Sequence, residues 1–251
     1  MSTFLTTPRP KKDPLRPYPE NLAAQTMKHN VPAGEEVVIP IKLVSGFVDI
    51  DVQVAEAAHA TVILQVKNRV DFSRVQLHGI LKKDAKFHLV GDISGGQRIE
   101  VKAWIELRES GSEAKVSGMF TGAGAEHQGM HVLMEHMAPS TRGDIFLRGV
   151  YKEESRGVFT GLIRVAKDAQ QTNSYFKDDV LLFDDALAES LPTLEILAND
   201  VKASHGSTTG RVDDEQLFYL MSRGLSKGQA SDMLVSGFFE KVRERLPKSS
   251  V

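Results

Sequence analysis

Apolar and polar residues alternate along most of this chain, from about residue 37 to residue 196. In one segment, four aliphatic residues occupy every second position: Val48, Ile50, Val52 and Val54. A later segment repeats the pattern with Ile99, Val101, Ala103, Ile105 and Leu107. A period of two is typical of β-strands with one buried face, and no segment in this range has a convincing helical period. The pattern therefore predicts a mainly β protein.

The predicted strands recur at a nearly constant interval. Successive apolar segments start about 12 to 14 residues apart, at Val48, Val62, Val75, Phe87 and Ile99. Glycine-rich or charged breaks at residues 95–96, 122–124 and 152–155 fit turns between strands. Short strands at regular spacing can form a sandwich, a barrel or a β-solenoid, and spacing alone leaves all three open.

The period changes to that of a helix after Gly210. Asp213 and Gln216 have the spacing of a helix N-cap, and Gly224 is expected to end this first helix. Ser226 and Gln229 repeat the cap spacing at the start of a second helix. Two short helices are rarely stable alone in water, so we expect this hairpin to pack on the β body, on a partner, or on both.

The helical hairpin has more apolar side chains than one stripe needs. Leu217 belongs to the regular stripe, whereas Phe218, Tyr219 and Phe239 lie outside it. Surplus aromatic residues are candidate anchors for a protein interface. The alternative is that they widen the face that packs on the β body.

The first residues of the chain differ in composition from the rest. Five of the ten prolines fall within residues 1–20, among Lys, Arg and Thr. Such a composition buries too little apolar surface to order itself. We expect a flexible arm over residues 1–34.

Charge and cysteine content exclude several classes of function. The 251 residues hold 31 basic and 33 acidic side chains, so no nucleic-acid or anionic-membrane partner is expected. No apolar run approaches a membrane span and the start lacks the core of a signal peptide, which predicts a cytoplasmic protein. The absence of cysteine excludes disulfides, thiolate nucleophiles and cysteine-ligated clusters built from this chain alone.

Residues 126–136 hold the densest group of possible metal ligands in the chain. On a strand, His127, His131 and Glu135 share one face, each about 13 Å from the next. A single ion cannot bridge that distance, and nearby glycines argue against a helix that would shorten it. We interpret the segment as a strand with a solvated polar face.

The polar stretch at residues 202–210, KASHGSTTG, raises a possible active site. It lacks the spacing of a phosphate-binding loop, and no nucleophile elbow accompanies His205 elsewhere in the chain. A nucleotide site and a hydrolase are therefore disfavoured. We expect the stretch to be a joint between the β body and the helices, with its glycines and hydroxyls serving a turn.

The same region resembles a known family. Residues 192–211, 213–225 and 230–242 closely resemble the C-terminal core of the SufB/SufD family of iron–sulfur cluster assembly proteins. Upstream, residues 158–165, 169–172 and 181–186 resemble further family segments, as does His136 with Pro139 and Ser140. A weaker likeness reaches back to about residue 40.

The resemblance implies a right-handed parallel β-helix with a small C-terminal helical hairpin domain. The expected boundaries are an arm at 1–34, a β-helix core at 35–210 and a helical domain at 211–251. It also implies a non-enzymatic scaffold subunit that pairs with a SufB-like chain, or with a second copy of itself. In the family the C-terminal helices dock the SufC-type ABC ATPase. This carries over to six candidate docking residues: Leu217, Phe218, Tyr219, Arg223, Phe238 and Phe239.

The resemblance assigns a chemical role to one residue. His205 matches a histidine that the family places at the subunit interface, which makes it a candidate iron ligand during cluster formation. Many SufD-like members have a cysteine where this chain has Ala203, and SufB-type chains carry a core cysteine that is absent here. We therefore expect a SufD-like chain that binds no cofactor stably alone and shares a transient iron–sulfur cluster with a partner. The alternative is a homodimeric, SufC-binding assembly or regulatory protein that builds no cluster.

Overall fold

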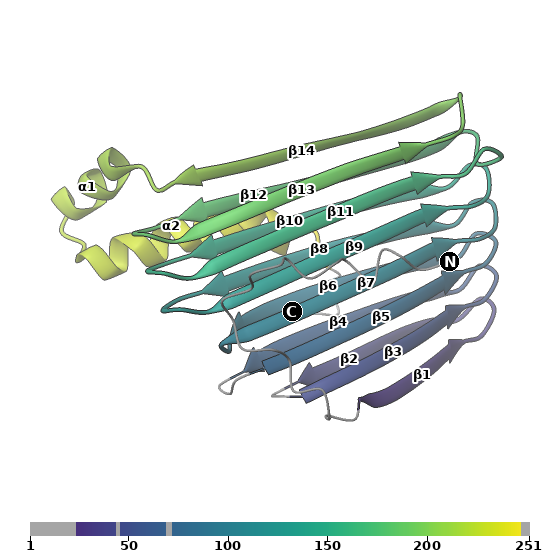
Figure 1. The fold of residues 1–251 in the computed structure, drawn as a ribbon, viewed down its shortest axis with the longest axis horizontal. Coiled ribbons are helices and arrows are strands. Elements are labelled where there is room, and N and C mark those ends of the chain that lie inside the picture. The colour runs from purple at the N-terminus through teal and green to yellow at the C-terminus, as the bar shows by residue number, and fades with distance from the viewer. Residues whose placement is uncertain (1–23, 44–45, 69–71, 247–251) are drawn as a thin grey trace, which may run out of the picture.

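A computed structural model describes residues 24–43, 46–68 and 72–246 of the chain. Fourteen strands and two helices make up this described part (Figure 1). The strands are β1 (Gln25–Val31), β2 (Glu36–Leu43), β3 (Gly46–Val54), β4 (His59–Asn68), β5 (Phe72–Leu81), β6 (Lys86–Gly95), β7 (Arg98–Leu107), β8 (Glu113–Gly122), β9 (His127–His136), β10 (Arg142–Tyr151), β11 (Arg156–Val165), β12 (Thr172–Leu182), β13 (Leu187–Ile196) and β14 (Val201–Arg211).

Successive strands alternate between two parallel sheets. The odd-numbered strands form one seven-stranded sheet in the order β1 to β13, and the even-numbered strands form the other. Val48 pairs with Val75 in the next turn, and Val75 pairs with Val101. Each strand is therefore half a turn, which explains the interval of 12 to 14 residues seen in the sequence. The parallel β-solenoid is confirmed, and the sandwich and the barrel are excluded.

The core fills the space between the two sheets. Strand β5 shows the rule, because every second side chain from Ser73 to Leu81 is buried and the others are only partly covered. The inner faces of the two parallel sheets pack against each other, and this shields the apolar side chains of both sheets from water. Turns occur at the predicted breaks, where Gly95, Gly124 and Glu153 have positive φ. Glycine adopts this conformation without strain.

The solenoid begins earlier than expected. Strand β1 pairs in parallel with β3, from Gln25 opposite Val48 to Val31 opposite Val54. The boundary predicted at residue 35 is therefore wrong, because residues from 25 onward belong to the first turn. Residues 1–23 of the expected arm lie outside the described residues.

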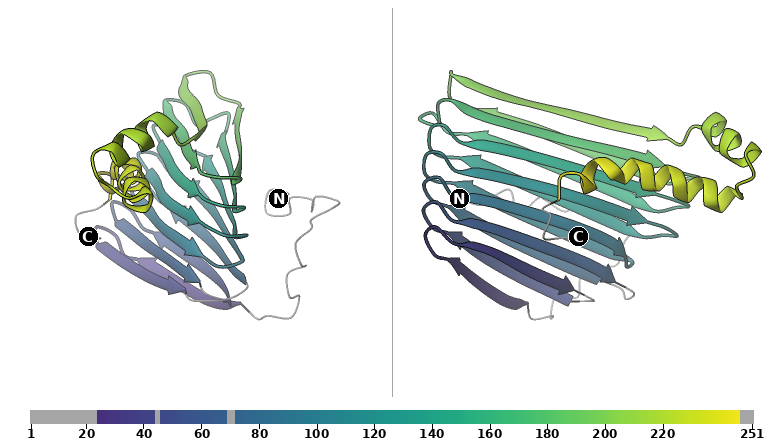
Figure 2. Two further views of the ribbon diagram at one scale, coloured as in Figure 1. Left: turned by 90° about the vertical axis from the view of Figure 1, so that its left-hand side faces the viewer. Right: turned by 180° about the vertical axis from the view of Figure 1, so that it is seen from behind.

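The two helices follow the last strand, as predicted. Helix α1 (Asp214–Ser222) is capped by Asp213 and ends before Gly224, which has a φ of 97°. Helix α2 (Lys227–Arg243) starts with a full capping box between Ser226 and Gln229. Figure 2 shows α2 lying along the outer face of the even-numbered sheet and α1 projecting past the strand ends. In the described part of the chain, neither helix is long and apolar enough to cross a membrane.

Candidate functional site

The stretch KASHGSTTG forms a regular strand. It lies within β14, which pairs with β12 along its whole length, from Val201 opposite Thr172 to Arg211 opposite Leu182. The expectation of a turn is wrong, because backbone hydrogen bonds to β12 hold the segment extended. Neither Gly206 nor Gly210 has a positive φ. The joint to the helices is the short segment after Arg211.

Strands β13 and β14 form the open end of the solenoid, at the top of Figure 1. Within the described chain, β13 pairs only with β11, and β14 pairs only with β12. Their outer edges therefore carry backbone N–H and C=O groups without a strand partner. Such edges are templates for pairing with another chain. No residue of either strand is fully buried, and the inward positions of β13 are only half-buried.

His205 lies on the inner side of this end. It is directly opposite Phe176, whose side chain is buried in the core, and residues in register on parallel strands point to the same face. Ala203 and Ser207 lie on that face too, two residues before and after His205. With no further turn above it, the His205 side chain is exposed. The imidazole is available to a group approaching the open end.

A buried carboxylate lies just below β14. Asp178, on the inner face of β12, is fully buried, and its Oδ2 accepts a hydrogen bond from Ser207 Oγ at 3.1 Å. Its Oδ1 has no hydrogen-bond partner among the described residues. Burial raises the pKa of Asp178, partly offset by the hydroxyls of Ser190 and Ser207. The last turn is therefore polar inside, whereas the turns below it are apolar.

Apolar side chains surround the open end on its outer surface. Leu187 and Leu191 project from β13, and Leu197 follows directly after it. Leu191 is 58% exposed and Leu197 is 61% exposed. Exposed aliphatic residues beside an unpaired strand edge are typical of a protein interface rather than of a solvated end.

The six candidate docking residues divide into two groups. Phe239 is only 4% exposed and packs with Val150 and Phe183 on the outer face of the even-numbered sheet. Phe238 packs beside it and is half-buried, and Leu217 is buried in α1. The chain itself covers these three side chains in full or in part, and their contact with an ATPase stays a prediction.

Phe218, Tyr219 and Arg223 remain on the surface. Phe218 is 72% exposed and Tyr219 is 58% exposed. The guanidinium of Arg223 lies 5.7 Å from the centre of the Tyr219 ring, within range of a cation–π contact. These three side chains form the aromatic patch of α1, a name used below for Phe218, Tyr219 and Arg223.

The histidine-rich segment at residues 126–136 is strand β9, as interpreted. Met130, Val132 and Met134 point into the core, and His131 and Glu135 lie on the outer face. That face is less solvated than expected, because His131 is hydrogen-bonded to Glu100 at 2.8 Å and to Thr160 at 2.8 Å. No group of three or more His, Cys, Asp or Glu side chains suited to a metal ion occurs in the described ranges.

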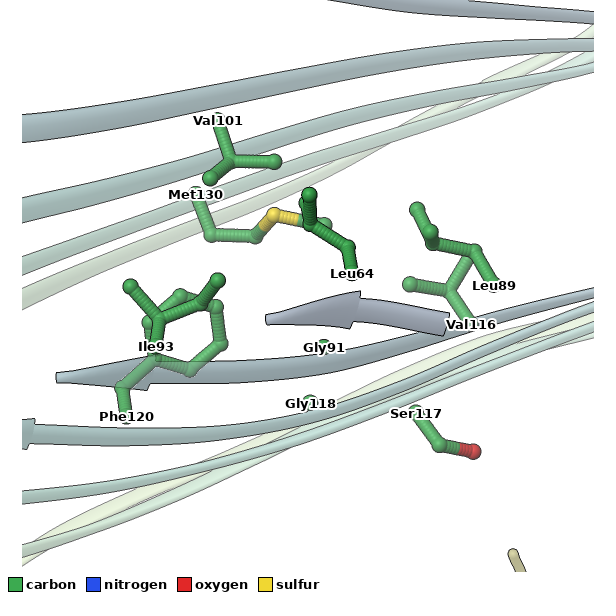
Figure 3. A pocket seen from close by; sticks show the side chains of 10 residues that line it. All are labelled: Leu64, Leu89, Gly91, Ile93, Val101, Val116, Ser117, Gly118, Phe120 and Met130. Atoms are coloured by element: carbon green, nitrogen blue, oxygen red, sulfur yellow. The ribbon is translucent and has the colours of Figure 1, made fainter. Parts of the chain in front are cut away.

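The core between the two sheets contains a small apolar cavity. A cavity of about 10 Å³ lies between Gly91, Gly118 and apolar side chains such as Met130 (Figure 3). In Figure 3, Ser117 points away from this cavity. A cavity of this size is close to the smallest that holds one water, and apolar cavities stay dry.

Sequence reasoning missed the charged residues around the last turns. Lys177, Asp178 and Asp179 are consecutive on a strand, so at least one carboxylate must face the core. The alternation of inward and outward positions on a strand was therefore enough to predict a buried carboxylate here without a structure. The nearer of the two ion-pair partners of Asp179, which is Arg148 on β10, could not be identified without the register of the turns.

Comparison with known proteins gives a consistent result. The family model described as "SUF system FeS cluster assembly, SufBD core domain" matches residues 41–238. A SufBD family protein of Mycobacterium leprae is 29% identical over 226 residues, covering 85% of this chain and 57% of the relative. A SufBD family protein of Mycobacterium tuberculosis is 31% identical over 187 residues, covering 67% of this chain and 47% of the relative.

A third relative is named iron-sulfur cluster assembly protein SufB, from Bacillus subtilis. It is 28% identical over 205 residues, which cover 81% of this chain and 44% of that protein. The chain thus spans about half the length of the relatives it matches. The family match covers the solenoid from the end of β2 onward and most of both helices, including the elements that carry the open end and the aromatic patch. On these grounds the chain belongs to the SufB/SufD family, whose defining unit is the SufBD core domain of the SUF system.

Proposed function

We propose that this chain is a non-enzymatic scaffold subunit of an iron–sulfur cluster assembly complex. Family membership supports a role in iron–sulfur cluster assembly, because the relatives are named for that process. The observation that carries the proposal is the open end of the solenoid, where exposed His205 lies on β14, one of two strands whose outer edges have no partner among the described strands. A scaffold needs a surface that a second subunit completes, and this end has that character.

Pairing through β13 and β14 is the first element of the proposal. A SufB-like chain, or a second copy of this chain, would add its own strands to these edges. Edge-to-edge pairing satisfies the free backbone groups of both subunits and covers Leu191 and Leu197. The SufD-like assignment rests on the absence of cysteine, since the partner would then supply the thiolates.

His205 is the proposed iron ligand of this chain. Neutral imidazole binds iron, and histidine replaces cysteine in some clusters. One imidazole cannot hold a cluster alone, so the cluster would be transient and shared with the partner. No cofactor would remain on the isolated chain.

The aromatic patch of α1 is the proposed docking surface for a SufC-like ATPase. Phe218 and Tyr219 are large, exposed and close together on a helix that projects from the solenoid (Figure 2). Aromatic and arginine side chains dominate the energetics of protein interfaces. The patch offers both kinds in adjacent turns of one helix.

Two experiments test this function. The first mixes the chain with a SufB-like partner, measures the mass of the complex, and follows anaerobic cluster reconstitution by absorption. His205→Ala should abolish most of the cluster yield without changing the mass. The matched control is His29→Ala, which alters a histidine on β1 at the opposite end of the solenoid. Equal yields for the His205→Ala variant and the wild type would contradict the role of His205.

The second experiment is a pull-down with a SufC-like ATPase. Phe218→Asp and Tyr219→Asp should lose binding while circular dichroism and melting temperature stay unchanged. Val38→Asp, which alters an exposed residue of β2 far from the helices, is the control and should bind normally. Binding that survives both α1 substitutions would show that the ATPase docks elsewhere.

The alternative is a homodimeric, SufC-binding assembly or regulatory protein that builds no cluster. The complete absence of cysteine favours it, because two copies of this chain bring no thiolate to the seam. It predicts a stable dimer of the chain alone, ATPase binding through α1, and no cluster with or without a SufB-like partner. Cluster yield in the first experiment therefore separates the two functions.

A further inference from the structure

Arg148 joins the helical hairpin to two different strands. It lies on the outer face of β10, under α2, where its Nη1 donates a hydrogen bond to the backbone carbonyl of Phe238. Its guanidinium lies 4.5 Å from the centre of the Phe238 ring. Its Nη2 donates to Asp179 Oδ2 on β12 at 2.9 Å. One side chain thus contacts α2 and β12 at the same time, although α2 itself packs mainly on β8 and β10.

Both charges of this contact are removed from water. Arg148 and Asp179 are both buried, at 6% and 8% exposure. A buried ion pair is costly to break by removing one partner, because the other charge loses its main compensation. Lys177 Nζ, 3.7 Å from Asp179 Oδ2, is a second and more exposed partner of this carboxylate. The guanidinium is planar and presents several donors in fixed directions, so it can hold a carbonyl and a carboxylate together. Lysine cannot reproduce this geometry.

A second arginine provides a useful contrast. Arg245, just after α2, donates to Asp144 Oδ2 on β10 at 2.8 Å, and its guanidinium lies 4.0 Å from the Phe146 ring. This contact also holds the C-terminal segment on the sheet. Unlike the Arg148 contact, the Arg245–Asp144 contact involves no residue of β12. The side chains of Arg245 and Asp144 are also both exposed.

The middle of β12 supports the middle of β14. Asp179 is paired in register with Thr208 of β14. The residue before it, Asp178, faces the core and accepts the hydrogen bond from Ser207. Both faces of β12 are thus held at residues 178–179. Ser207 binds Asp178 on the inner face, and Arg148 binds Asp179 on the outer face. Because β14 pairs with β12 alone among the described strands, any loosening of β12 here must reach β14.

We propose that Arg148 is a positioning residue that couples the placement of α2 to the order of the central part of β14, residues 203–208, which contains His205. When α2 is seated, its Phe238 carbonyl holds the guanidinium against Asp179. When α2 moves away, Arg148 loses that support, and the Asp179 carboxylate is held less firmly by Arg148 and keeps its longer contact to Lys177 Nζ at 3.7 Å. The functional meaning of this coupling rests on the docking proposed above, whereas the coupling itself exists in the isolated chain.

A second, apolar route must be separated from this one. Phe183 and Val212 contact the same cluster as Phe239, so α2 also contacts the ends of β12 and β14 directly. Those contacts act on the C-terminal ends of the two strands, from Leu181 of β12 and from Val212 just after β14. The readout is therefore taken at residues 203–208, which lie before these ends and are in register with residues 174–179 of β12, where the Arg148–Asp179 contact lies.

The test is hydrogen exchange, followed by mass spectrometry, on the full chain without any partner. Three variants are compared with the wild type: Arg148→Gln, Asp179→Asn and Arg245→Gln. Arg148→Gln should speed amide exchange at least about tenfold both in α2 and at residues 203–208, as expected when hydrogen bonds to a charged group are lost. Arg148→Lys should restore part of the protection but not all of it.

The other two variants should divide these effects. Asp179→Asn should speed exchange at residues 203–208 more than in α2, because Arg148 loses its carboxylate partner and keeps its contacts to the Phe238 carbonyl and ring. Arg245→Gln should speed exchange only in α2. The proposal is overturned if Arg148→Gln or Asp179→Asn leaves residues 203–208 at the wild-type rate, or if Arg245→Gln speeds them equally. If Arg148→Gln does not fold, the different exchange patterns of Asp179→Asn and Arg245→Gln still decide whether the proposal holds.

No ATPase is present in this experiment. A negative result here therefore leaves the docking proposal intact, and a failure of docking would leave this coupling intact.

Discussion

Ser207 Oγ donates to Asp178 Oδ2 across the last two strands of the even-numbered sheet, at a distance of 3.1 Å. The two residues are in register on β14 and β12, and both face the core. Burial raises the pKa of Asp178, so its charged form is disfavoured in the folded protein. This contact is the inner attachment of the strand that carries His205.

The raised pKa of Asp178 predicts that Asp178→Asn stabilises the protein at neutral pH. The asparagine can still accept from Ser207, and it leaves no buried charge, so we expect a gain of about 1 kcal/mol in the free energy of unfolding at pH 7. The folded pKa lies above the ordinary value of 3.8, so the folded wild type binds more protons than the unfolded chain between those two values. Stability of the wild type is therefore lost as pH rises through the raised pKa.

Urea unfolding at pH 7 and near pH 4 checks this expectation. The advantage of the asparagine variant should be present at pH 7 and should shrink as pH falls toward the ordinary pKa of aspartate. Ser207→Ala is the companion variant and should lower stability, because it removes the hydrogen bond and keeps the buried carboxylate. An asparagine variant less stable than the wild type at pH 7 would mean that the carboxylate is needed in its charged form.

A second pH effect follows from His136 in the core at the end of β9. Its Nδ1 lies 2.8 Å from Thr141 Oγ1, and burial lowers its pKa from 6.5 to about 4. The unfolded chain therefore binds a proton on this histidine between pH 6.5 and 4 that the folded protein does not. The stability contributed by His136 is present above pH 6.5 and is lost as pH falls toward 4, by about 3 kcal/mol in total.

The measurement is the free energy of unfolding at pH 7, 6 and 5, for the wild type and for His136→Gln. The variant should be less stable at pH 7, because a packed and hydrogen-bonded ring is lost. Its stability should fall less steeply with acid than that of the wild type. Parallel pH profiles for the two proteins would show that His136 does not titrate as inferred.

The alternation of residues was enough to predict strands and the interval between them, but not the architecture. Val48 and Val75 are 27 positions apart, and only the pairing between them shows that they are neighbours. Strand β1 was missed for a related reason. It lies at the edge of the first turn, where only Val31 is fully buried, so its alternation is weak.

The open end was misread because its composition differs from that of the other strands. Inward positions of a middle turn must be apolar, whereas His205 and Ser207 face a space that no later turn covers. Glycine and hydroxyl residues usually indicate a turn, and β14 is a strand only because β12 offers a complete ladder of partners. Similarly, helical spacing grouped Phe218 with Phe239, and only the position of α2 on the sheet separates them.

The cavity inside the solenoid predicts opposite effects for two neighbouring glycines. Gly91 and Gly118 are in register on β6 and β8, and both line the cavity. A Cβ at Gly91 would meet no atom closer than 3.8 Å, whereas a Cβ at Gly118 would lie 2.7 Å from the Phe120 ring. Alanine also restricts the unfolded chain more than glycine does.

Gly91→Ala should therefore stabilise the protein by about 0.5 kcal/mol, and Gly118→Ala should destabilise it by about 1 to 3 kcal/mol. Thermal unfolding of the two variants side by side is the check. Because the sites are adjacent and the substitution is the same, each variant is the control for the other. A loss of stability at Gly91 would indicate that the cavity is already filled in solution.

Phe218 and Phe239 give the last prediction, which separates folding from docking within the helical hairpin. Phe239→Ala should cost about 3 kcal/mol, because the ring is buried against Val150 and Phe183 and its removal leaves a cavity. Phe218→Ala should change stability by less than about 0.5 kcal/mol, since its ring contacts mainly solvent. Thermal unfolding measures both. If Phe218→Ala is as destabilising as Phe239→Ala, the Phe218 ring is part of the hairpin's own packing, and loss of ATPase binding in the Phe218→Asp variant could no longer be assigned to the docking surface.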